Sequence, residues 1–210
     1  STFSSISLLQ KQILLYTVSK GIPEQHWHIP LPNSAQFFRQ SLSFTEGTIT
    51  MQYFSYIPSP LGTLLITEEQ NAITRLSLSS EETLLMQFPA GSMKEQETPL
   101  ISTAKQQLAE YFQGTRKNFS LPLAPFGTPF QHKVWDALCT IPYGETRSYK
   151  EIAIQVGNPK GYRAVGMANN RNPIMVIVPC HRVIGSNGAL VGYAGGLGIK
   201  EWLMEHEKNH

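Results

Sequence analysis

The strongest chemical signal in this sequence is a cysteine followed directly by a histidine. Cys180 comes after a proline and a run of five apolar residues, 174–178, which predicts a short buried strand that ends just before the cysteine. The nucleophilic form of cysteine is the thiolate, which is a minor species at neutral pH unless a base or a positive charge lies nearby. His181 is such a base, so the pair indicates a cysteine nucleophile activated by an imidazole.

The acid that would orient this imidazole must come from elsewhere in the chain. Neighbouring residues on a strand point to opposite faces, so His181 reaches Cys180 only where the chain turns, or through a water. Glu205 or Glu207 on the last expected helix could orient the ring. The residues alone leave a second interpretation open, in which Cys180 is a buried apolar residue and His181 lies at the surface. Cys139 fits that description and is expected to be inert, because it lies in an amphipathic helix without a polar helper.

Other patterns give little support for a metal or a phosphate-binding loop. The six histidines are scattered, and a zinc deaminase would need a second cysteine where Val183 stands. The glycine-rich segment 192–196 is not followed by the Lys-Ser/Thr of a phosphate loop, and its glycines suit a close approach of the backbone to a flat ligand. We therefore expect neither a metal nor a cofactor.

Helical patterns with clear start signals surround the Cys-His pair. Thr128 and Ser148 each open a capping-box pattern that is followed by apolar residues at helical spacing. An Asn-Pro pair predicts a third helix over residues 158–169, so that the second and third helices have the form of a helix–turn–helix. A closing helix is expected over residues 200–207.

The first half of the chain shows β-strand patterns. Three stretches are rich in β-branched and aromatic residues and are separated by turn residues; they are 53–57, 63–67 and 73–78. Apolar residues at helical spacing then predict a helix over 101–112, ended by Gly114. A short helix is expected at 7–19, but residues 1–50 receive no assigned role.

These elements together predict an α+β protein. The stretch 115–127, which is rich in proline at 121–127, is expected to be a linker, and the domain boundary is placed there. The prediction is an N-terminal extension at 1–50 and a small α/β domain with an antiparallel sheet at 51–120. A mainly helical C-terminal domain at 121–210 would contain the helix–turn–helix and a short strand bearing the active cysteine.

Composition excludes several classes of protein. The chain has 210 residues, of which 41% are apolar and only 15% are charged, which favours a packed core over disorder. It contains no apolar run near 18 residues and no basic-then-apolar leader, so neither a membrane span nor a secretory signal is expected. Two cysteines make no disulfide framework, which favours a reducing, cytoplasmic location.

Charge is distributed unevenly along the chain. The total of +2 is too small to indicate a nucleic-acid partner by itself. However, residues 144–182 hold six basic and two acidic side chains, a net of +4, whereas residues 1–125 hold eight basic and nine acidic ones, a net of −1. This concentration fits an ordinary solvated helix face and also fits a phosphate-contacting stripe on the helix–turn–helix.

The segment 178–183, Val-Pro-Cys-His-Arg-Val, resembles the alkyl-acceptor motif of the O6-alkylguanine-DNA alkyltransferases, also called methylated-DNA–protein-cysteine methyltransferases. The resemblance extends over 127–207. The other motifs, in chain order, are Gly-Thr-Pro-Phe-Gln, Ile-Pro-Tyr-Gly-Glu-Thr, Gly-Asn-Pro-Lys, Arg-Ala-Val-Gly, Asn-Pro, and Gly-Tyr-Ala-Gly-Gly followed by Lys-Glu-Trp-Leu. Residues 51–120 resemble the N-terminal domain of the same family more loosely, and 1–50 match nothing in it.

The resemblance implies a catalytic role for four residues. Cys180 would accept the alkyl group, His181 would activate it through a bridging water, and Glu207 would orient His181. Asn172 would brace the turn between the recognition helix and the active-site strand. No metal or cofactor takes part in this chemistry.

The resemblance also implies a DNA-binding surface. Arg163 would fill the gap that a flipped guanine leaves in the stack, and Tyr149 would contact both DNA and the guanine. Lys160 and Arg171 belong to the same surface, where the small side chain of Ala164 allows a close approach to the backbone. The recognition helix is expected in the minor groove.

A substrate pocket is implied beside the cysteine. The carbonyl groups of Cys180 and Val183 would accept hydrogen bonds from the exocyclic amine of guanine. Tyr193 and the backbone amide of Ala194 would line the pocket, together with Tyr149.

The implied function is direct repair of double-stranded DNA by a monomer. Cys180 would take a methyl or small alkyl group from O6-alkylguanine, and also from O4-alkylthymine, and each molecule would act once. Two alternatives are a non-catalytic sensor of alkyl lesions on the same fold, against which Cys180 argues, and a Cys-His hydrolase. The hydrolase would need an oxyanion hole and turnover, and it would not need Arg163.

Overall fold

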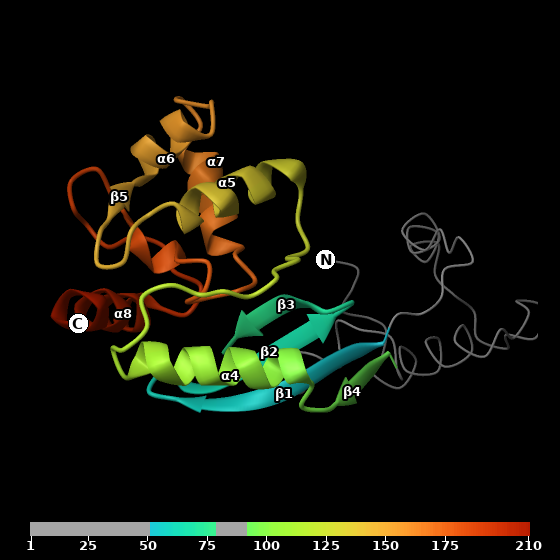
Figure 1. The fold of residues 1–210 in the computed structure, drawn as a ribbon. Coiled ribbons are helices and arrows are strands. Elements are labelled where there is room, and N and C mark those ends of the chain that lie inside the picture. The colour runs from blue at the N-terminus through green and yellow to red at the C-terminus, as the bar shows by residue number, and fades with distance from the viewer. Residues whose placement is uncertain (1–50, 79–91) are drawn as a thin grey trace, which may run out of the picture. The chain divides into compact units, whose positions relative to one another are not determined.

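The computed structural model describes residues 51–78 and 92–210, whose elements are shown in Figure 1. A four-stranded sheet has the order β3-β2-β1-β4, and β2 pairs antiparallel with both β1 and β3. The strands are β1 (Gln52–Ser59), β2 (Gly62–Glu69), β3 (Ala72–Ser77) and β4 (Met93–Glu95). The three strands expected from the sequence are confirmed, whereas the three residues of β4 carry too little pattern to predict one. The helix expected at 7–19 lies outside the described residues.

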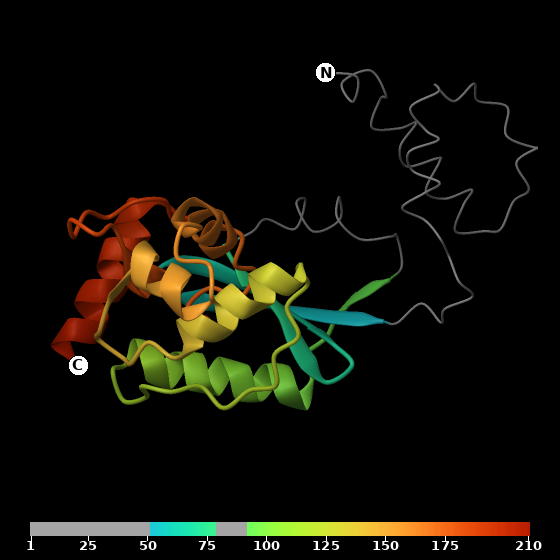
Figure 2. The same ribbon diagram turned by 90° about the horizontal axis from the view of Figure 1, so that it is seen from above.

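Helix α4 (Pro99–Phe112) packs on one face of this sheet, as Figures 1 and 2 show. The Thr98 side chain caps its first turn by accepting a backbone N–H, and a proline occupies the first helical position. The buried face of the helix ends at Tyr111, whose side chain has no exposed surface. The expected helix is therefore present, and it carries a buried tyrosine at its C-terminal end.

Two helices of the C-terminal part begin with capping boxes. They are α5 (Pro129–Cys139) and α6 (Tyr149–Gln155). In each, the N-cap side chain, Thr128 or Ser148, accepts the backbone N–H three residues later, and the side chain at that position returns a hydrogen bond to the N-cap backbone. Both helix starts expected from the sequence are confirmed.

Helix α7 (Tyr162–Asn170) packs against α5 and α6 and completes the helix–turn–helix. It begins at residue 162, not at 158 as expected. Residues 158–161 form a turn in which the Gly161 N–H donates to the Asn158 carbonyl at 2.8 Å. A residue before a proline avoids helical backbone, so the Asn-Pro pair opens the turn and not the helix.

The prediction of a strand at 174–178 is wrong. Ile174 makes a single parallel bridge to Leu76, after which the chain folds into tight turns, with Val176 at a φ of 69°. Cys180 then begins the one-turn 3-10 helix η4 (Cys180–Arg182), so the active-site element is this turn and not a strand end. The apolar run is buried as expected, but buried side chains without alternation do not distinguish a strand from a buried coil.

Two short strands and a final helix complete the described part. β5 (Arg147–Ser148) and β6 (Val183–Ile184) pair in parallel and join the start of α6 to the segment after η4. Helix α8 (Leu197–Asn209) is longer at both ends than the expected 200–207. One hydrophobic core connects the sheet, α4 and the C-terminal helices, which confirms the α+β class. No helix in the described ranges is long and apolar enough to cross a membrane.

Candidate active site

The thiol of Cys180 lies at the start of η4 and is almost completely buried, with 4% of the residue exposed. Asn172 Nδ2 lies 3.0 Å from the sulfur and 2.8 Å from the Val178 carbonyl oxygen. Asn172 Oδ1 accepts the Ile174 N–H at 3.0 Å. One side chain thus holds both ends of the turn that carries the thiol and also donates toward the sulfur.

The imidazole of His181 is fully buried against the last helix. Its Nε2 lies 2.8 Å from Glu207 Oε1, whereas Glu205, the other acidic candidate, is exposed. An ionised carboxylate only accepts hydrogen bonds, so Nε2 carries the proton and Nδ1 of the neutral ring presents its lone pair. Nδ1 is buried and forms no hydrogen bond with any residue that the structure describes. It is therefore the free basic atom of the pair.

The Glu207 carboxylate is surrounded by donors. Oε1 accepts from His181, from Arg182 Nη2 at 2.9 Å and from the Tyr111 hydroxyl at 2.8 Å. Oε2 accepts from Arg182 Nε at 2.8 Å and from the Gly144 N–H at 3.1 Å. Gly144 has a φ of 75°, a left-handed conformation that favours glycine. Burial alone would raise the pKa of Glu207, but the hydrogen bonds from His181 and Arg182 outweigh it and hold that pKa far below its usual range.

Burial decides the resting protonation of the reactive pair. It raises the pKa of the Cys180 thiol, although nearby donors and the charge of Lys200 act in the opposite direction. It lowers the pKa of His181, against the opposing effect of Glu207. At neutral pH the pair is therefore a thiol beside a neutral imidazole. The arrangement can form the thiolate by transfer of the proton to the imidazole, because Glu207 lies in place to stabilise the positive charge that would result.

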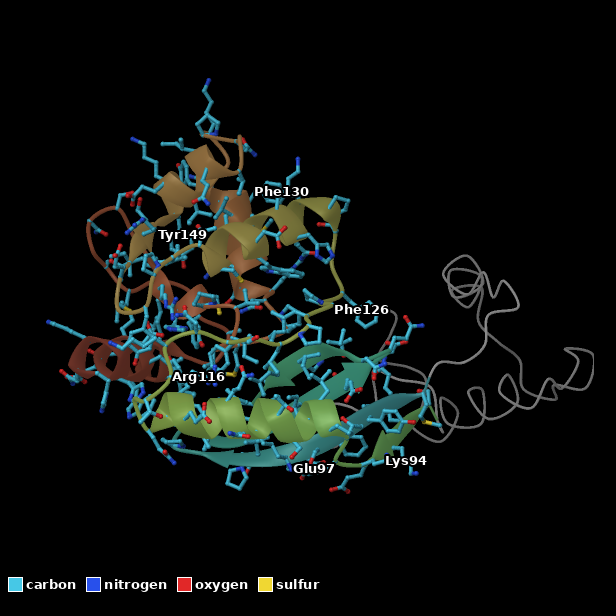
Figure 3. The ribbon with its side chains drawn as sticks, viewed as in Figure 1. Lys94, Glu97, Arg116, Phe126, Phe130 and Tyr149 are labelled. Atoms are coloured by element: carbon cyan, nitrogen blue, oxygen red, sulfur yellow. The ribbon has the colours of Figure 1, made fainter. Side chains whose placement is uncertain are left out.

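Two phenols lie close to the sulfur. Burial and then the neighbouring Cys180 raise the pKa of Tyr149, at the start of α6, and of Tyr193, in the glycine-rich loop. The Tyr149 hydroxyl donates to the Val191 carbonyl at 3.0 Å, and Figure 3 shows this side chain in the helical part, away from the sheet. Asn169 Nδ2 donates to the Cys180 carbonyl at 3.2 Å. The tyrosines expected in the pocket are thus placed beside the thiol.

The buried ammonium group of Lys200 joins the residue just before the glycine-rich segment to β6. Its Nζ donates to the Val183 carbonyl at 2.5 Å and to the Val191 carbonyl at 3.1 Å, and the side chain has no exposed surface. Val183 is itself buried, and its carbonyl oxygen keeps a second lone pair. Ala194, the remaining pocket residue expected from the sequence, is exposed in the loop.

Apart from Tyr149 on α6, the expected DNA-contacting residues lie on or beside α7. Arg163 is exposed in its first turn, with its guanidinium 6.0 Å from the centre of the Tyr162 ring, and Ala164 follows half-buried. Lys160 is exposed in the preceding turn, and Arg171 is exposed at the C-cap. Within residues 51–78 and 92–210, none of these three cations forms an ion pair with an acidic side chain.

Arg182 does not belong to this exposed face, although it is one of the six basic residues in the charge count for 144–182. Its side chain is buried, and it forms an ion pair with Glu207 at 2.8 Å. Arg147 is also compensated, since it pairs with Glu145 at 2.9 Å. The prediction of one basic stripe is wrong for Arg182, because a buried carboxylate requires a cationic partner and Arg182 supplies it.

Sequence reasoning missed five residues of the site: Tyr111, Gly144, Asn169, Arg182 and Lys200. The sequence contains a pattern that could have identified Lys200. Its spacing from Leu203 and Glu207 places all three on one buried face of α8, where a lysine needs polar partners. Tyr111 and Gly144 had no such pattern, because 96 and 63 residues separate them from Glu207.

Among residues 51–78 and 92–210, neither a metal site nor a second activated cysteine accompanies this cluster. In the part of the chain that the structure describes, no group of three or more His, Cys, Asp and Glu side chains is arranged to bind a metal ion. Cys139, the second cysteine, ends α5 and is an exposed residue, and partial burial of its thiol followed by the negative charge of Asp136 raises the pKa of that thiol. It is therefore a poor nucleophile.

The fold and the site define a class of protein: one with a buried cysteine next to a histidine–glutamate pair, set beside a helix–turn–helix with an exposed basic surface. A family model described as the 6-O-methylguanine DNA methyltransferase, DNA binding domain, matches residues 129–209. A second, described as the ribonuclease-like domain of 6-O-methylguanine DNA methyltransferase, matches residues 52–125. The chain belongs to the 6-O-methylguanine DNA methyltransferase family.

This chain matches individual relatives over nearly the whole length of each relative. The constitutive methylated-DNA–protein-cysteine methyltransferase of Bacillus subtilis is 54% identical over 159 residues, which is 75% of this chain and 96% of that protein. A methylated-DNA–protein-cysteine methyltransferase of Methanosarcina barkeri is 49% identical over 158 residues, 75% of this chain and 98% of its own length. The crystal structure of Mycobacterium tuberculosis OGT in complex with DNA is similar with a TM-score of 0.67 and 45% identity, covering 75% of this chain and 93% of that one. The family resemblance expected from the sequence is confirmed.

Proposed function

We propose that Cys180 accepts a methyl or other small alkyl group from O6-alkylguanine in double-stranded DNA. The protein acts in DNA repair by alkyl transfer, and it is an enzyme of the methylated-DNA–protein-cysteine methyltransferase kind. The assignment to Cys180 rests on one observation: its buried sulfur lies 3.0 Å from Asn172 Nδ2, and the residue that follows it forms a 2.8 Å pair with Glu207.

The chemistry is a displacement in line with the breaking bond. His181 takes the thiol proton through a bridging water, and Glu207 stabilises the imidazolium that forms. The thiolate attacks the alkyl carbon, a sulfur–carbon bond forms, and the carbon–oxygen bond breaks with its electron pair left on the guanine oxygen. The product is a thioether, which thiol exchange does not reopen. Each molecule therefore acts once.

The flipped guanine is proposed to enter the space beside the thiol. Tyr149 would hydrogen-bond the base, and Tyr193 and the Ala194 amide would line the pocket. The carbonyl groups of Cys180 and Val183 would accept from the exocyclic amine through their remaining lone pairs. O4-alkylthymine would be a second substrate of the same pocket.

The exposed face of α7 is proposed to contact the minor groove. Flipping a base out of a duplex costs a few kcal/mol, less for a damaged base that pairs poorly, and Arg163 would fill the gap in the stack. Lys160 and Arg171 would contact phosphates, and the small Ala164 would allow the helix to approach the backbone. We expect a cytoplasmic monomer, with a domain at 51–120 and a DNA-binding domain at 121–210.

The decisive experiment is to mix the protein with duplex DNA carrying labelled O6-methylguanine and to determine the mass and label of the protein. A gain of one methyl group per molecule, lost in Cys180→Ala and kept in Cys139→Ala, is expected. Binding without any gain in mass by the parent protein would indicate a sensor and overturn the proposal. Repeated turnover would indicate a hydrolase.

A further inference from the structure

The carboxylate that pairs with His181 is also held by the sheet-side part of the molecule. Helix α8 lies beside the C-terminal end of α4, as Figures 1 and 2 both show. At this contact, the hydroxyl of Tyr111 on α4 donates to Glu207 Oε1 at 2.8 Å, the same oxygen that accepts from His181 Nε2 at 2.8 Å. The contact therefore joins α4 directly to the acid of the site.

We propose that Tyr111 is a positioning residue for alkyl transfer, which fixes the Glu207 carboxylate against His181 from outside the DNA-binding half of the chain. The inference rests on the proposed function of Cys180. Tyr111 is fully buried, so its hydroxyl has no access to water as an alternative partner, and a buried hydroxyl without a partner would be costly. Its single described acceptor is Glu207.

The ring of Tyr111 is held rigidly enough for this role. It packs in an aromatic cluster with ring centres at 5.4 Å from Phe112, 5.5 Å from Phe119, 6.0 Å from Tyr143 and 5.4 Å from His206. The backbone is also tied to α8, because His206 Nε2 lies 2.8 Å from the Tyr111 carbonyl oxygen. Packing on several sides leaves the hydroxyl one direction, toward Glu207.

This hydrogen bond has a consequence for the acid–base pair. With Tyr111 in place, Oε1 shares its negative charge among three donors. When the Tyr111 hydroxyl is removed, Glu207 Oε1 loses one of its donors, and its negative charge interacts more strongly with protonated His181. The pKa of His181 therefore rises. A larger fraction of the imidazole is then protonated and unable to accept the thiol proton at a given pH.

The other charged groups around the pair are all accounted for among the described residues. Glu207 faces His181 and Arg182 from η4 and Tyr143 from the segment before β5. His181 faces Glu207, Arg182 and, on α8, Lys200. None of these groups changes in a Tyr111→Phe variant, so a change in acid–base behaviour reports the missing hydroxyl.

The test is the pH dependence of Cys180 alkylation by a free O6-alkylguanine base, which avoids any contribution from DNA binding. In Tyr111→Phe we expect the midpoint of the acid limb to rise by roughly one pH unit, so that transfer below the midpoint slows about tenfold. Tyr143→Phe is the matched control, because it removes a hydroxyl from the same aromatic cluster that forms no hydrogen bond with any described residue.

The outcomes separate this inference from the proposed function. A raised midpoint in Tyr111→Phe and an unchanged one in Tyr143→Phe support it, provided that both variants unfold cooperatively in urea. An unchanged midpoint in folded Tyr111→Phe, or an equal shift in both variants, would overturn it. If the parent protein is not alkylated on Cys180 at all, the proposed function fails instead.

Discussion

The charged groups around Glu207 and those along α7 lie in opposite environments. Glu207, His181 and Arg182 are each less than 10% exposed, and both His181 and Arg182 pair with Glu207 at 2.8–2.9 Å. Arg163 and Lys160 are exposed, and no acidic side chain in the described ranges pairs with either. An arginine therefore belongs to a fixed network in one region and to an unpaired positive surface in the other.

The difference shows how the two tasks of such a protein are divided. Proton transfer needs atoms held in one geometry and shielded from water, which the buried network provides. DNA binding needs uncompensated cations that exchange counterions for phosphates, which only an exposed face provides. Salt and single charge changes should accordingly have different effects on the two regions.

The largest effect is expected from Glu207→Gln. It leaves the buried guanidinium of Arg182 without a negative partner, which typically costs about 3–5 kcal/mol of unfolding free energy. Urea unfolding followed by circular dichroism would measure the loss. Glu205→Gln, an exposed change on the same helix, is the control and should leave stability nearly unchanged. If Glu207→Gln lowers the unfolding free energy by less than about 1 kcal/mol, buried pairing does not distinguish the Glu207 cluster from the exposed charges along α7.

An intermediate effect is expected from Arg163→Ala. Without a side chain to fill the stack, repair of O6-methylguanine in duplex DNA should slow about tenfold to a hundredfold, because the flipped state loses part of its support. Alkylation by the free base should keep the parent rate, since no stack is involved. Single-turnover rates on both substrates would measure this, with Arg171→Ala, at the C-cap of the same helix, as the equal change in charge. Equal losses on both substrates would contradict the flipping role.

The smallest effect is expected from Lys160→Ala. If Lys160 contacts a phosphate, its removal should weaken duplex binding uniformly across sequences and reduce the slope of log affinity against log salt by about 1. Fluorescence anisotropy at several salt concentrations would measure the slope. Alkylation by the free base should not depend on salt in either protein, because the buried network is screened very little. An unchanged slope would remove Lys160 from the DNA-binding surface.

Local features of the fold were predictable where neighbouring residues alone decide them. Thr128 and Ser148 cap α5 and α6 through atoms only three residues away, so the sequence pattern contained the whole interaction. The run 174–178 was predictable as buried but not as coil, since its turns are held by Asn172 and by the bridge to Leu76. Whether a segment is buried follows from its residue types, whereas the path of its backbone depends on partners that are distant in the sequence.

The same division holds for the site. Cys180 and His181 were found because they are adjacent, and the resemblance singled out Glu207, whose distance of 2.8 Å from the imidazole the structure supplies. Arg182 was misplaced on the basic face, because charge counted along a chain does not tell which cations are buried.

By itself, the sequence determined the family and the capped helices that follow residue 127, and it predicted the Cys-His pair of the site, because these depend on residue identity and short spacing. Only the tertiary structure decided which carboxylate oxygen meets which donor. Tyr111 reaches Glu207 across 96 residues, and Lys200 joins Val183 of β6 to Val191. Such contacts arise when separate elements pack together, and a hydrogen bond acts over only about 3 Å of space whatever the separation along the chain.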